Sequence, residues 1–205
     1  RVLRHNIRND LNAARGWLEL LDQEATINDD GKERIWTAIR KIDEVTQKAE
    51  RARYIEQAIS DSSVESTAIG PVVEKAVRTV EGSHPDADVT VTGDTDLAVL
   101  ADTNLDMALA EALTNAIVHQ DDPTAAVTLR VQTLSPGKVA IDVENPGPPI
   151  PESERQAITR GYETQLDHGS GLGLWLIKWI VENAHGRVLF PDDEAGDGQI
   201  RLELY

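Results

Sequence analysis

Three glycines at alternate positions form the sharpest chemical signal in this chain. Gly169, Gly171 and Gly173 lie in the segment Gly-Ser-Gly-Leu-Gly-Leu, directly before an apolar run that predicts a helix from about residue 171 to 184. Glycine lets a backbone approach a ligand closely, and the first turn of a helix presents free N–H groups. The segment therefore suits an anion such as a triphosphate, although a glycine-rich loop can also be a simple connector.

Two further segments carry polar residues that could complete such a site. Glu111 and Asn115 are four residues apart on a strongly amphipathic helix expected over residues 105–118, so they share one face. An Asn oxygen and a nearby carboxylate could hold Mg²⁺ and its waters against phosphates. The third segment, Asn-Pro-Gly-Pro-Pro-Ile-Pro at 145–151, ends a predicted strand and turns sharply. Taken alone, an Asn on an amphipathic helix is more often a solvated surface residue.

Residues 1 to about 60 contain no proline and predict two helices joined by a turn at 28–31. Their apolar residues repeat at helical spacing: Leu11, Ala14, Leu18 and Leu21, then Ile35, Ala38, Ile42, Val45, Ala49 and Ala52. Because one antiparallel hairpin cannot bury two apolar stripes, we expect it to pair with a second copy in a dimeric four-helix bundle. The alternative is packing on its own C-terminal domain. Trp17 and Trp36 are expected within the hairpin or at the dimer seam.

Beyond a linker at 61–63 the pattern alternates between helices and strands, which predicts an α+β domain at 63–205 after the hairpin domain at 1–62. Helices are expected at about 71–81, 105–118 and 171–184, and strands at 89–91, 97–100, 127–131, 139–143, 188–190 and 200–204. Residues between 145 and 171 are expected to form a loop. Helices stacked on one face of a mixed sheet would make an α/β sandwich. Trp175 and Trp179 are expected in the core or an interface.

The composition excludes several function classes. Thirty-six acidic residues oppose twenty basic ones, a net charge of −16, which repels nucleic acids and anionic membranes. Acid excess with only six Lys is typical of proteins in molar salt, so a halophilic source is one hypothesis and an ordinary acidic cytosolic protein the other. The absence of Cys excludes disulfides and is consistent with the cytoplasm. No apolar run spans a bilayer, so any membrane contact would need an upstream segment.

The order and separation of these segments resemble the N box and the two glycine boxes of the Bergerat-type ATP-binding fold, which histidine kinases share with chaperone, gyrase and mismatch-repair ATPases. The segment Arg-His-Asn-Ile-Arg-Asn-Asp-Leu at 4–11 resembles the H box of histidine kinases, commonly His-Glu-Leu-Arg-Thr-Pro-Leu. His5, Arg8 and Leu11 match it. Together with Glu163-Thr164 and residues 168–171, this segment is most similar to haloarchaeal histidine kinases. The resemblance covers nearly the whole chain.

The resemblance implies an ATP-dependent protein-histidine kinase of a two-component system, with ATP and Mg²⁺ as cofactors. His5 would accept the phosphoryl group and pass it to an aspartate of a response-regulator receiver domain, and Asn9 would serve in dephosphorylation of that partner. Asn115 would hold Mg²⁺, and residues from about Thr159 to Ser170 would form a lid over ATP. His119 would approach the phosphates, or is a plain helix C-terminal histidine. The implied nucleotide-binding residues are Glu111, Asn115, His119, Asn145, Gly147, His168, Gly169, Ser170, Gly171, Leu172 and Gly173.

Three positions depart from the family pattern. Asn6 replaces an acidic residue after the histidine, so it can accept the imidazole N–H but adds no charge, and slower autophosphorylation is expected. Asp10 replaces a helix-kinking proline, so the helix should be straighter there. Asn145 replaces the Asp that receives a hydrogen bond from the adenine amino group, and Pro149 replaces a glycine. Adenine affinity is expected to fall about ten-fold.

These departures leave two alternatives open. One is a catalytically weak dimeric scaffold, or a phosphatase-biased sensor, that binds a response regulator. The other is a chaperone- or topoisomerase-type ATPase, which would leave the histidine-bearing hairpin unexplained.

Overall fold

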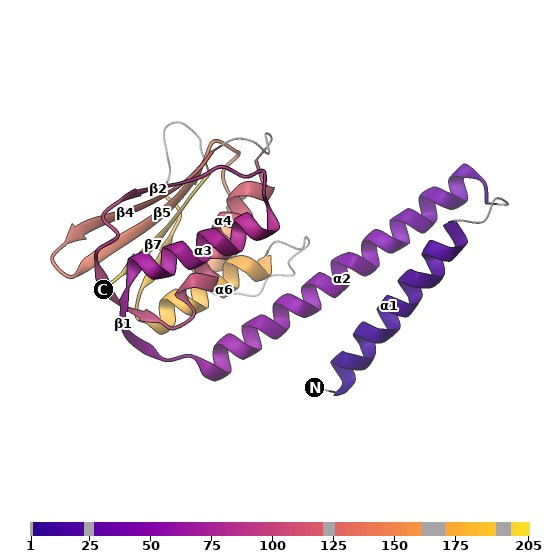
Figure 1. Cartoon of the computed structure of the whole chain (residues 1–205), viewed down its shortest axis with the longest axis horizontal. Helices are drawn as coiled ribbons and strands as arrows, with labels where there is room; N and C mark the ends of the chain where they lie inside the picture. Colours follow the sequence, from indigo (N-terminus) through magenta and orange to yellow (C-terminus); the bar gives the residue numbers. More distant parts are fainter. Residues whose placement is uncertain (1, 23–26, 121–125, 161–170, 192–197) are drawn as a thin grey trace. The chain divides into compact units, whose positions relative to one another are not determined.

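The computed structural model describes residues 2–22, 27–120, 126–160, 171–191 and 198–205 (Figure 1). Its contacts divide the chain into two compact units, residues 1–57 and 58–205. The division falls inside a helix, a few residues before the boundary expected at 62. In the described part of the chain, every helix is too short or too polar to cross a bilayer.

The first unit is built from α1 (Val2–Asp22) and α2 (Asp29–Asp61), and α1 continues through Asp10 without a break. The segment expected as the turn between them is instead the start of α2. The Asn28 side-chain oxygen accepts a hydrogen bond from the Gly31 N–H at 2.9 Å, which caps the helix. A Cβ on Gly31 would lie only 2.6 Å from the Cγ2 methyl of Ile27, so a larger residue there would require the Ile27 side chain to shift. The expected turn at 28–31 is therefore wrong by a few residues.

α1 and α2 run antiparallel and are joined by charge as well as by apolar packing. Arg15 contacts Asp43 of α2 and Glu19 of its own helix, each at 2.9 Å. The hydrogen bond to Glu19, followed by the charge of Asp43, raises the pKa of Arg15. Ile39 is the buried apolar side chain of the described part of this unit. Packing within the hairpin thus covers only part of its apolar surface.

The two Trp of the hairpin lie on its uncovered surface. Trp17 is 69% exposed and Trp36 is 61% exposed, so the expectation that they pack within the hairpin is wrong. Other exposed apolar side chains of this unit are Leu20, Leu21 and Val45. An uncovered surface of this kind costs solubility unless another surface buries it.

The second unit is a sheet covered on one face by helices (Figure 1). The strand order in the five-stranded sheet is β2-β4-β5-β7-β6, with β2 and β4 parallel and the other neighbours antiparallel. The strands are β1 (Val64–Ala68), β2 (Val89–Gly93), β3 (Ala98–Asp102), β4 (Val127–Ser135), β5 (Lys138–Asn145), β6 (Arg187–Leu189) and β7 (Gly198–Leu204). The helices are α3 (Ile69–Ser83), α4 (Leu105–Val118), α5 (Glu152–Arg160) and α6 (Gly171–Asn183).

Two elements, β1 and α5, differ from the expected pattern because they were not predicted, and one predicted strand belongs to a different sheet. β1 follows the linker directly, and its side chains are mostly exposed, so it lacks a buried alternating pattern. α5 has nine residues and is strongly polar, so few apolar residues mark it as a helix. The strand expected at 97–100 is present as β3, but it pairs with β1 in a separate two-stranded sheet. The Leu100 N–H of β3 donates a hydrogen bond to the carbonyl oxygen of Tyr205 at 2.6 Å.

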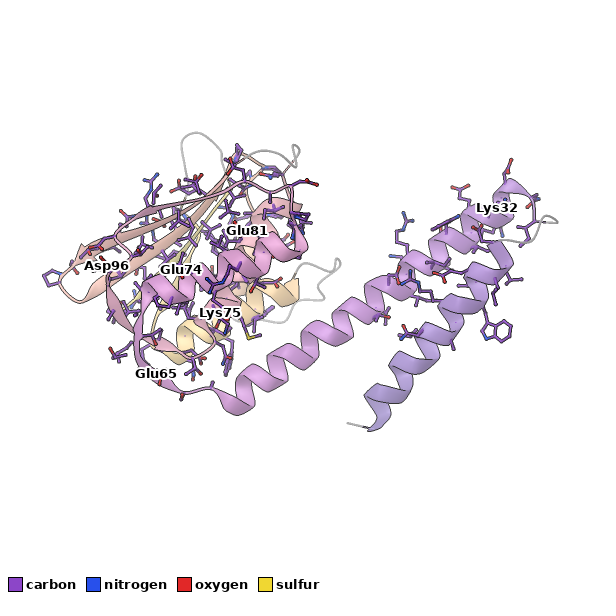
Figure 2. All side chains as sticks on the ribbon, in the orientation of Figure 1. Lys32, Glu65, Glu74, Lys75, Glu81 and Asp96 are labelled. Carbon is purple, nitrogen blue, oxygen red and sulfur yellow. The ribbon has the colours of Figure 1, made fainter. Side chains whose placement is uncertain are left out.

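Helix periodicity decides which side chains enter the core. α4 buries residues at steps of three and four, and its neighbours α3 and α6 do the same. The largest fully buried side chains are Ile69, Leu105, Leu109, Leu113, Leu129, Ile141, Ile177, Ile180, Leu202, Leu204, Val80 and Val127. Each contributes about 1.5–3 kcal/mol by leaving water. Charged side chains such as Glu74 and Lys75 occupy the solvent side of α3, where Lys75 contacts Asp106 of α4 at 2.8 Å (Figure 2).

A buried carboxylate cross-links three strands of the main sheet. Asp142 on β5 is 1% exposed. Arg201 of β7 donates to it at 2.6 and 3.2 Å, and Gln132 of β4 donates at 2.6 Å. The hydrogen bond to Asp142 raises the pKa of Arg201. Since these partners are on neighbouring strands, the contacts favour the observed strand register over a slipped one.

A second buried carboxylate fixes the start of α4. Asp102, at the end of β3, is 1% exposed. It accepts two hydrogen bonds from Asn104 at 2.9 Å and one from Asn183, at the end of α6, at 2.6 Å. Asn183 also donates to Ser62 at 3.2 Å. The carboxylate therefore joins the turn before α4, the end of α6 and the segment after α2.

Replacing Asp102 should destabilise the second unit. In Asp102→Ala the amides of Asn104 and Asn183 lose their acceptor in a buried place, and we expect a loss of about 2–3 kcal/mol in the free energy of unfolding. Urea unfolding followed by Trp fluorescence measures this loss. Asp86→Ala, at an exposed turn, is the matched control and should change stability by less than about 0.5 kcal/mol. Equal losses in the two variants would refute the assigned role of Asp102.

Candidate nucleotide-binding site

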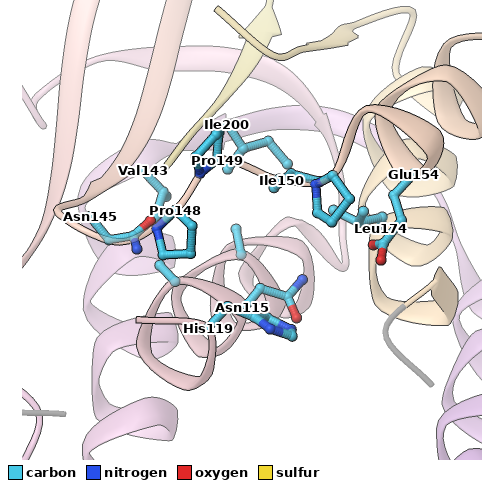
Figure 3. A pocket seen from close by; sticks show the side chains of 13 residues that line it. Asn115, His119, Val143, Asn145, Pro148, Pro149, Ile150, Glu154, Leu174 and Ile200 are labelled. Atoms are coloured by element: carbon cyan, nitrogen blue, oxygen red, sulfur yellow. The ribbon is translucent and has the colours of Figure 1, made fainter. Parts of the chain in front are cut away.

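A cavity of about 220 Å³ lies among α4, the end of β5, α5 and α6 (Figure 3). Its walls are largely apolar and carry four polar side chains. The lining residues are Ala112, Asn115, Ala116, His119, Val143, Asn145, Pro148, Pro149, Ile150, Pro151, Glu154, Leu174 and Ile200. Apolar walls with a few polar groups are typical of pockets that bind small organic ligands.

α4 forms one wall of the cavity. Its apolar stripe packs into the core, and the two small residues Ala112 and Ala116 leave space beside the helix. Asn115 and His119, one turn apart, point their polar groups into that space (Figure 3). The His119 N–H donates to the Asn115 carbonyl at 3.1 Å and ends the helix. His119 is thus both the helix-terminal residue and a lining residue of the pocket.

The end of β5 forms the opposite wall. Asn145 is 8% exposed and lies beside Pro148 (Figure 3). Gly147 follows in the turn and packs under the end of α4, because a Cβ there would lie 2.9 Å from the Gln120 Cα atom. The expected reason for this glycine was close approach to a ligand. The structure adds contact with α4 as a steric reason.

The N-terminal turn of α6 touches α4 directly. A Cβ on Gly173 would lie 2.9 Å from the Glu111 carboxyl carbon and 3.0 Å from its Cγ atom. Glu111, which lies one turn of α4 before Asn115, is therefore packed against Gly173, the third glycine of the glycine box at residues 169–173. Two motifs that are sixty residues apart in the sequence meet at this contact.

The structure brings together only part of the expected site. Asn115, His119 and Asn145 line the cavity, and Glu111, Gly147 and Gly173 pack around it. Gly171 and Leu172 begin α6. His168, Gly169 and Ser170 lie outside the described residues. His5, Asn6 and Asn9 belong to α1 in the other unit, and their side chains are likewise outside the described part.

The region expected as a loop and lid contributes an unexpected lining residue. Thr159 belongs to α5, and residues 161–170 of the expected lid lie outside the described residues. Glu154 of the same helix lies at the end of the cavity away from Asn145, near Leu174 (Figure 3). Pro151 followed by an acidic first turn is a helix-start signal that could have revealed α5. The position of α5 beside the cavity depends on tertiary packing, which the residues of α5 alone do not indicate.

The electrostatics of the described pocket favour a ligand that arrives with its own cation. None of the lining residues is Lys or Arg, whereas a triphosphate carries several negative charges. No group of three or more acidic or His side chains in the described residues could hold a metal by itself. The Asn115 amide, with the Glu111 carboxylate one turn away, fits a Mg²⁺ ion that keeps several waters and is bound mainly through phosphates.

Comparison with known proteins identifies the family to which this geometry belongs. A family model of histidine kinase-, DNA gyrase B- and HSP90-like ATPases matches residues 101–204. The chain belongs to this ATPase family. The α+β fold expected for the second domain is thus confirmed, and α4, the cavity and α6 all fall within the matched residues of this ATPase domain.

Individual relatives point in the same direction. The sensor histidine kinase GlrK of Escherichia coli strain K12 is 30% identical over 161 residues, which are 72% of this chain and 32% of GlrK. The structure of full-length ShkA in complex with AMPPNP covers 99% of this chain and 44% of ShkA, with a TM-score of 0.63 and 18% identity. The Acinetobacter baumannii histidine kinase AdeS covers 98% of this chain and 96% of its own, with a TM-score of 0.61 and 16% identity.

These comparisons differ in what they establish. The two structural matches establish a shared fold, since their identities are 18% and 16%. The chain spans about a third of the length of GlrK, at 32%. The ATPase domain is the part of the chain for which the family is shown.

The contact between Glu111 and Gly173 can be tested with a double-mutant cycle. Gly173→Ala should displace the Glu111 side chain and cost about 1–3 kcal/mol of folding free energy. In a Glu111→Ala background the same change should be neutral, or stabilising by up to about 1 kcal/mol, because Ala is the better helix former. Denaturant unfolding of the four proteins measures the coupling. Equal costs in both backgrounds would rule out this contact.

Proposed function

We propose that this chain is the catalytic core of a sensor histidine kinase that phosphorylates itself on His5 from ATP. The observation that carries the proposal is the cavity that joins Asn115, His119 and Asn145 beside the glycine-box helix. The H-box segment on α1 supplies a histidine that the ATPase domain alone would not need. The family match and the sensor-kinase relatives support the same assignment.

The residues divide the chemistry between them. The apolar wall between Val143 and Ile200 takes the base, with Asn145 at its edge, and Asn115 and His119 lie toward the phosphates. Asn115 would hold Mg²⁺, which when bound would supply positive charge to the phosphate oxygens. The first turn of α6 directs N–H groups at the phosphates.

For the phosphoryl transfer itself, the protein mainly positions the reacting groups and stabilises the negative charge. A neutral imidazole nitrogen of His5 forms a bond to the γ-phosphorus, the bond from that phosphorus to the β,γ-bridging oxygen breaks, and ADP leaves. The phosphorylated imidazolium donates a hydrogen bond from its remaining ring N–H to the Asn6 amide oxygen and then gives that proton to water, which leaves a neutral phosphohistidine ring. In a second step the phosphoryl group passes to an aspartate oxygen of a response-regulator receiver domain, which restores His5.

We propose further that the hairpin pairs with that of a second chain. Exposed apolar side chains on both helices, with Trp17 and Trp36 foremost, need a covering surface that packing within the hairpin does not supply. A four-helix bundle made of two hairpins would bury them. The chain would then work as a homodimer in the cytoplasm, where ATP is available.

A second candidate function is a phosphatase-biased or catalytically weak sensor. Asn6 and Asn145 both remove a negative charge that the family pattern places near the nucleophile or the base. Asn9 remains in place for dephosphorylation of the partner. This candidate predicts ATP binding with little label on His5.

The first test is transfer of label from γ-labelled ATP with Mg²⁺ in high KCl. The native chain should gain acid-labile label, and His5→Gln should gain none, because Gln keeps the polarity of the side chain but lacks the nucleophilic ring nitrogen. ATP binding should be equal in both. Equal labelling of the two chains would disprove His5 as acceptor, and labelling of neither chain would favour the weak sensor.

The same assay measures what Asn6 contributes. Asn6→Asp should raise the labelling rate by about ten-fold, since a carboxylate stabilises the cationic imidazole where an amide only accepts the hydrogen bond. Asn12→Asp, at an exposed position of α1, adds the same charge and should leave the rate unchanged. A rate that does not respond to Asn6→Asp contradicts this account.

The acidic composition leads to a prediction about salt. Because the net charge is −16, screening of acidic self-repulsion should stabilise the fold. We expect the melting temperature to rise as KCl increases from about 0.1 M to molar levels, where the Debye length falls to about 3 Å. A melting temperature that falls as KCl is added would contradict the halophilic hypothesis.

A further inference from the structure

We propose that Asn183, at the end of α6, is a positioning residue for phosphate binding, because its side chain fixes where α6 lies along its own axis against α4. The inference rests on the proposed function, namely that the first turn of α6 binds phosphates and that Asn115 of α4 holds their Mg²⁺. It adds a residue at the opposite end of α6 that touches neither the nucleotide nor the metal ion.

α4 and α6 pack against each other and run in opposite directions (Figure 1). The end of α6 lies beside the start of α4, where the Asn183 amide nitrogen donates to Asp102 at 2.6 Å. Toward the other end of the interface, Gly173 near the start of α6 packs against Glu111. The two helices are therefore in contact at both ends of their interface. The position of α6 along its axis consequently decides how far its first turn lies from Asn115.

The hydrogen bond of Asn183 specifies this axial position more sharply than the other contacts do. Both helices bury apolar side chains, among them Leu109 of α4 and Ile177 of α6, but burial of apolar surface has no preferred direction. The contact of Gly173 is with the end of the flexible Glu111 side chain, which can yield. A hydrogen bond weakens steeply with distance and angle. Because a helix is stiff along its axis, with a rise of about 1.5 Å per residue, a shift at Asn183 moves the first turn of α6 equally.

The surroundings of Asn183 hold its amide in one orientation. A carboxylate only accepts hydrogen bonds, so the amide nitrogen faces Asp102. The same nitrogen donates its other hydrogen to the Ser62 hydroxyl oxygen at 3.2 Å. Asp102 is 1% exposed, and its other oxygen accepts from the backbone and the side chain of Asn104. The carboxylate is thus fixed to the turn before α4, and Asn183 ties α6 to that fixed point.

The test compares ADP with adenosine, because adenosine lacks the phosphates that α6 would bind. Each competes with trinitrophenyl-ATP for the full chain in Mg²⁺ and high KCl. In Asn183→Ala the dissociation constant of ADP should rise about ten-fold, because the first turn of α6 is displaced, while that of adenosine should not change. Asn104→Ala is the matched control, since it removes an amide from the same carboxylate but leaves α6 tied to Asp102. It should keep the native ratio of the two constants.

A reciprocal exchange tests the hydrogen bond itself. In the double variant Asp102→Asn with Asn183→Asp, the amide lies on the α4 side and the carboxylate on the α6 side, so the same bond forms in the reverse direction. Position 102 keeps an oxygen for Asn104. The exchange should restore the native ratio of the adenosine constant to the ADP constant. A merely structural role for Asn183 would change stability without changing this ratio in any variant.

The outcomes separate this inference from the function on which it rests. An ADP constant that is unchanged in Asn183→Ala would overturn the inference and leave the nucleotide site intact. A folded exchange variant that keeps the ratio of Asn183→Ala would also overturn it. If circular dichroism shows that Asn183→Ala does not fold, the milder Asn183→Ser supplies the same comparison. Failure of ADP to displace trinitrophenyl-ATP from the native chain would overturn the proposed function and the inference together.

Discussion

Burial of α4 is the constraint on which the site depends. Its apolar stripe is fully used in the core between the sheet, α3 and α6, so the helix cannot rotate without exposing Leu109 or Leu113. Rotation is further opposed at its start by the buried Asp102 carboxylate. Asn115 and His119 therefore project toward the pocket as a consequence of how the opposite side of the helix is packed. One face of α4 thus stabilises the core, and the other face lines the pocket.

Two glycines then decide how closely the other parts approach this helix. Gly173 admits the Glu111 side chain, and Gly147 admits the end of α4 at Gln120. A Cβ on Gly147 would meet the α4 backbone at Gln120, whereas a Cβ on Gly173 would displace the end of the flexible Glu111 side chain. Steric fit between protein segments thus favours glycine at both positions, and most strongly at Gly147. Glycine at these positions consequently serves assembly of the site before any nucleotide is present.

Elements with a strong period were predictable, and weak ones were not. The stripe of α4 and the β-branched runs of β4 and β5 place those elements within a few residues, because burial on one face or on both leaves a clear pattern. β1 is short and largely exposed, and α5 has nine residues, of whose described side chains only those of Ala157 and Ile158 are buried, so neither leaves a long pattern of buried residues. For the same reason Glu154 could not be assigned to the pocket.

Residue type and order indicated an α+β domain, and the resemblance to the Bergerat-type ATP-binding fold selected Asn115 and Asn145. Distances between segments required the folded chain. The contact of Glu111 with Gly173, the approach of α5, and the burial that leaves Asn145 as the only buried polar residue lining the described pocket all join residues far apart in sequence. Such contacts depend on the whole set of packed elements. The hydrophobic period of one segment indicates which of its faces is buried, but it does not indicate which other element covers that face.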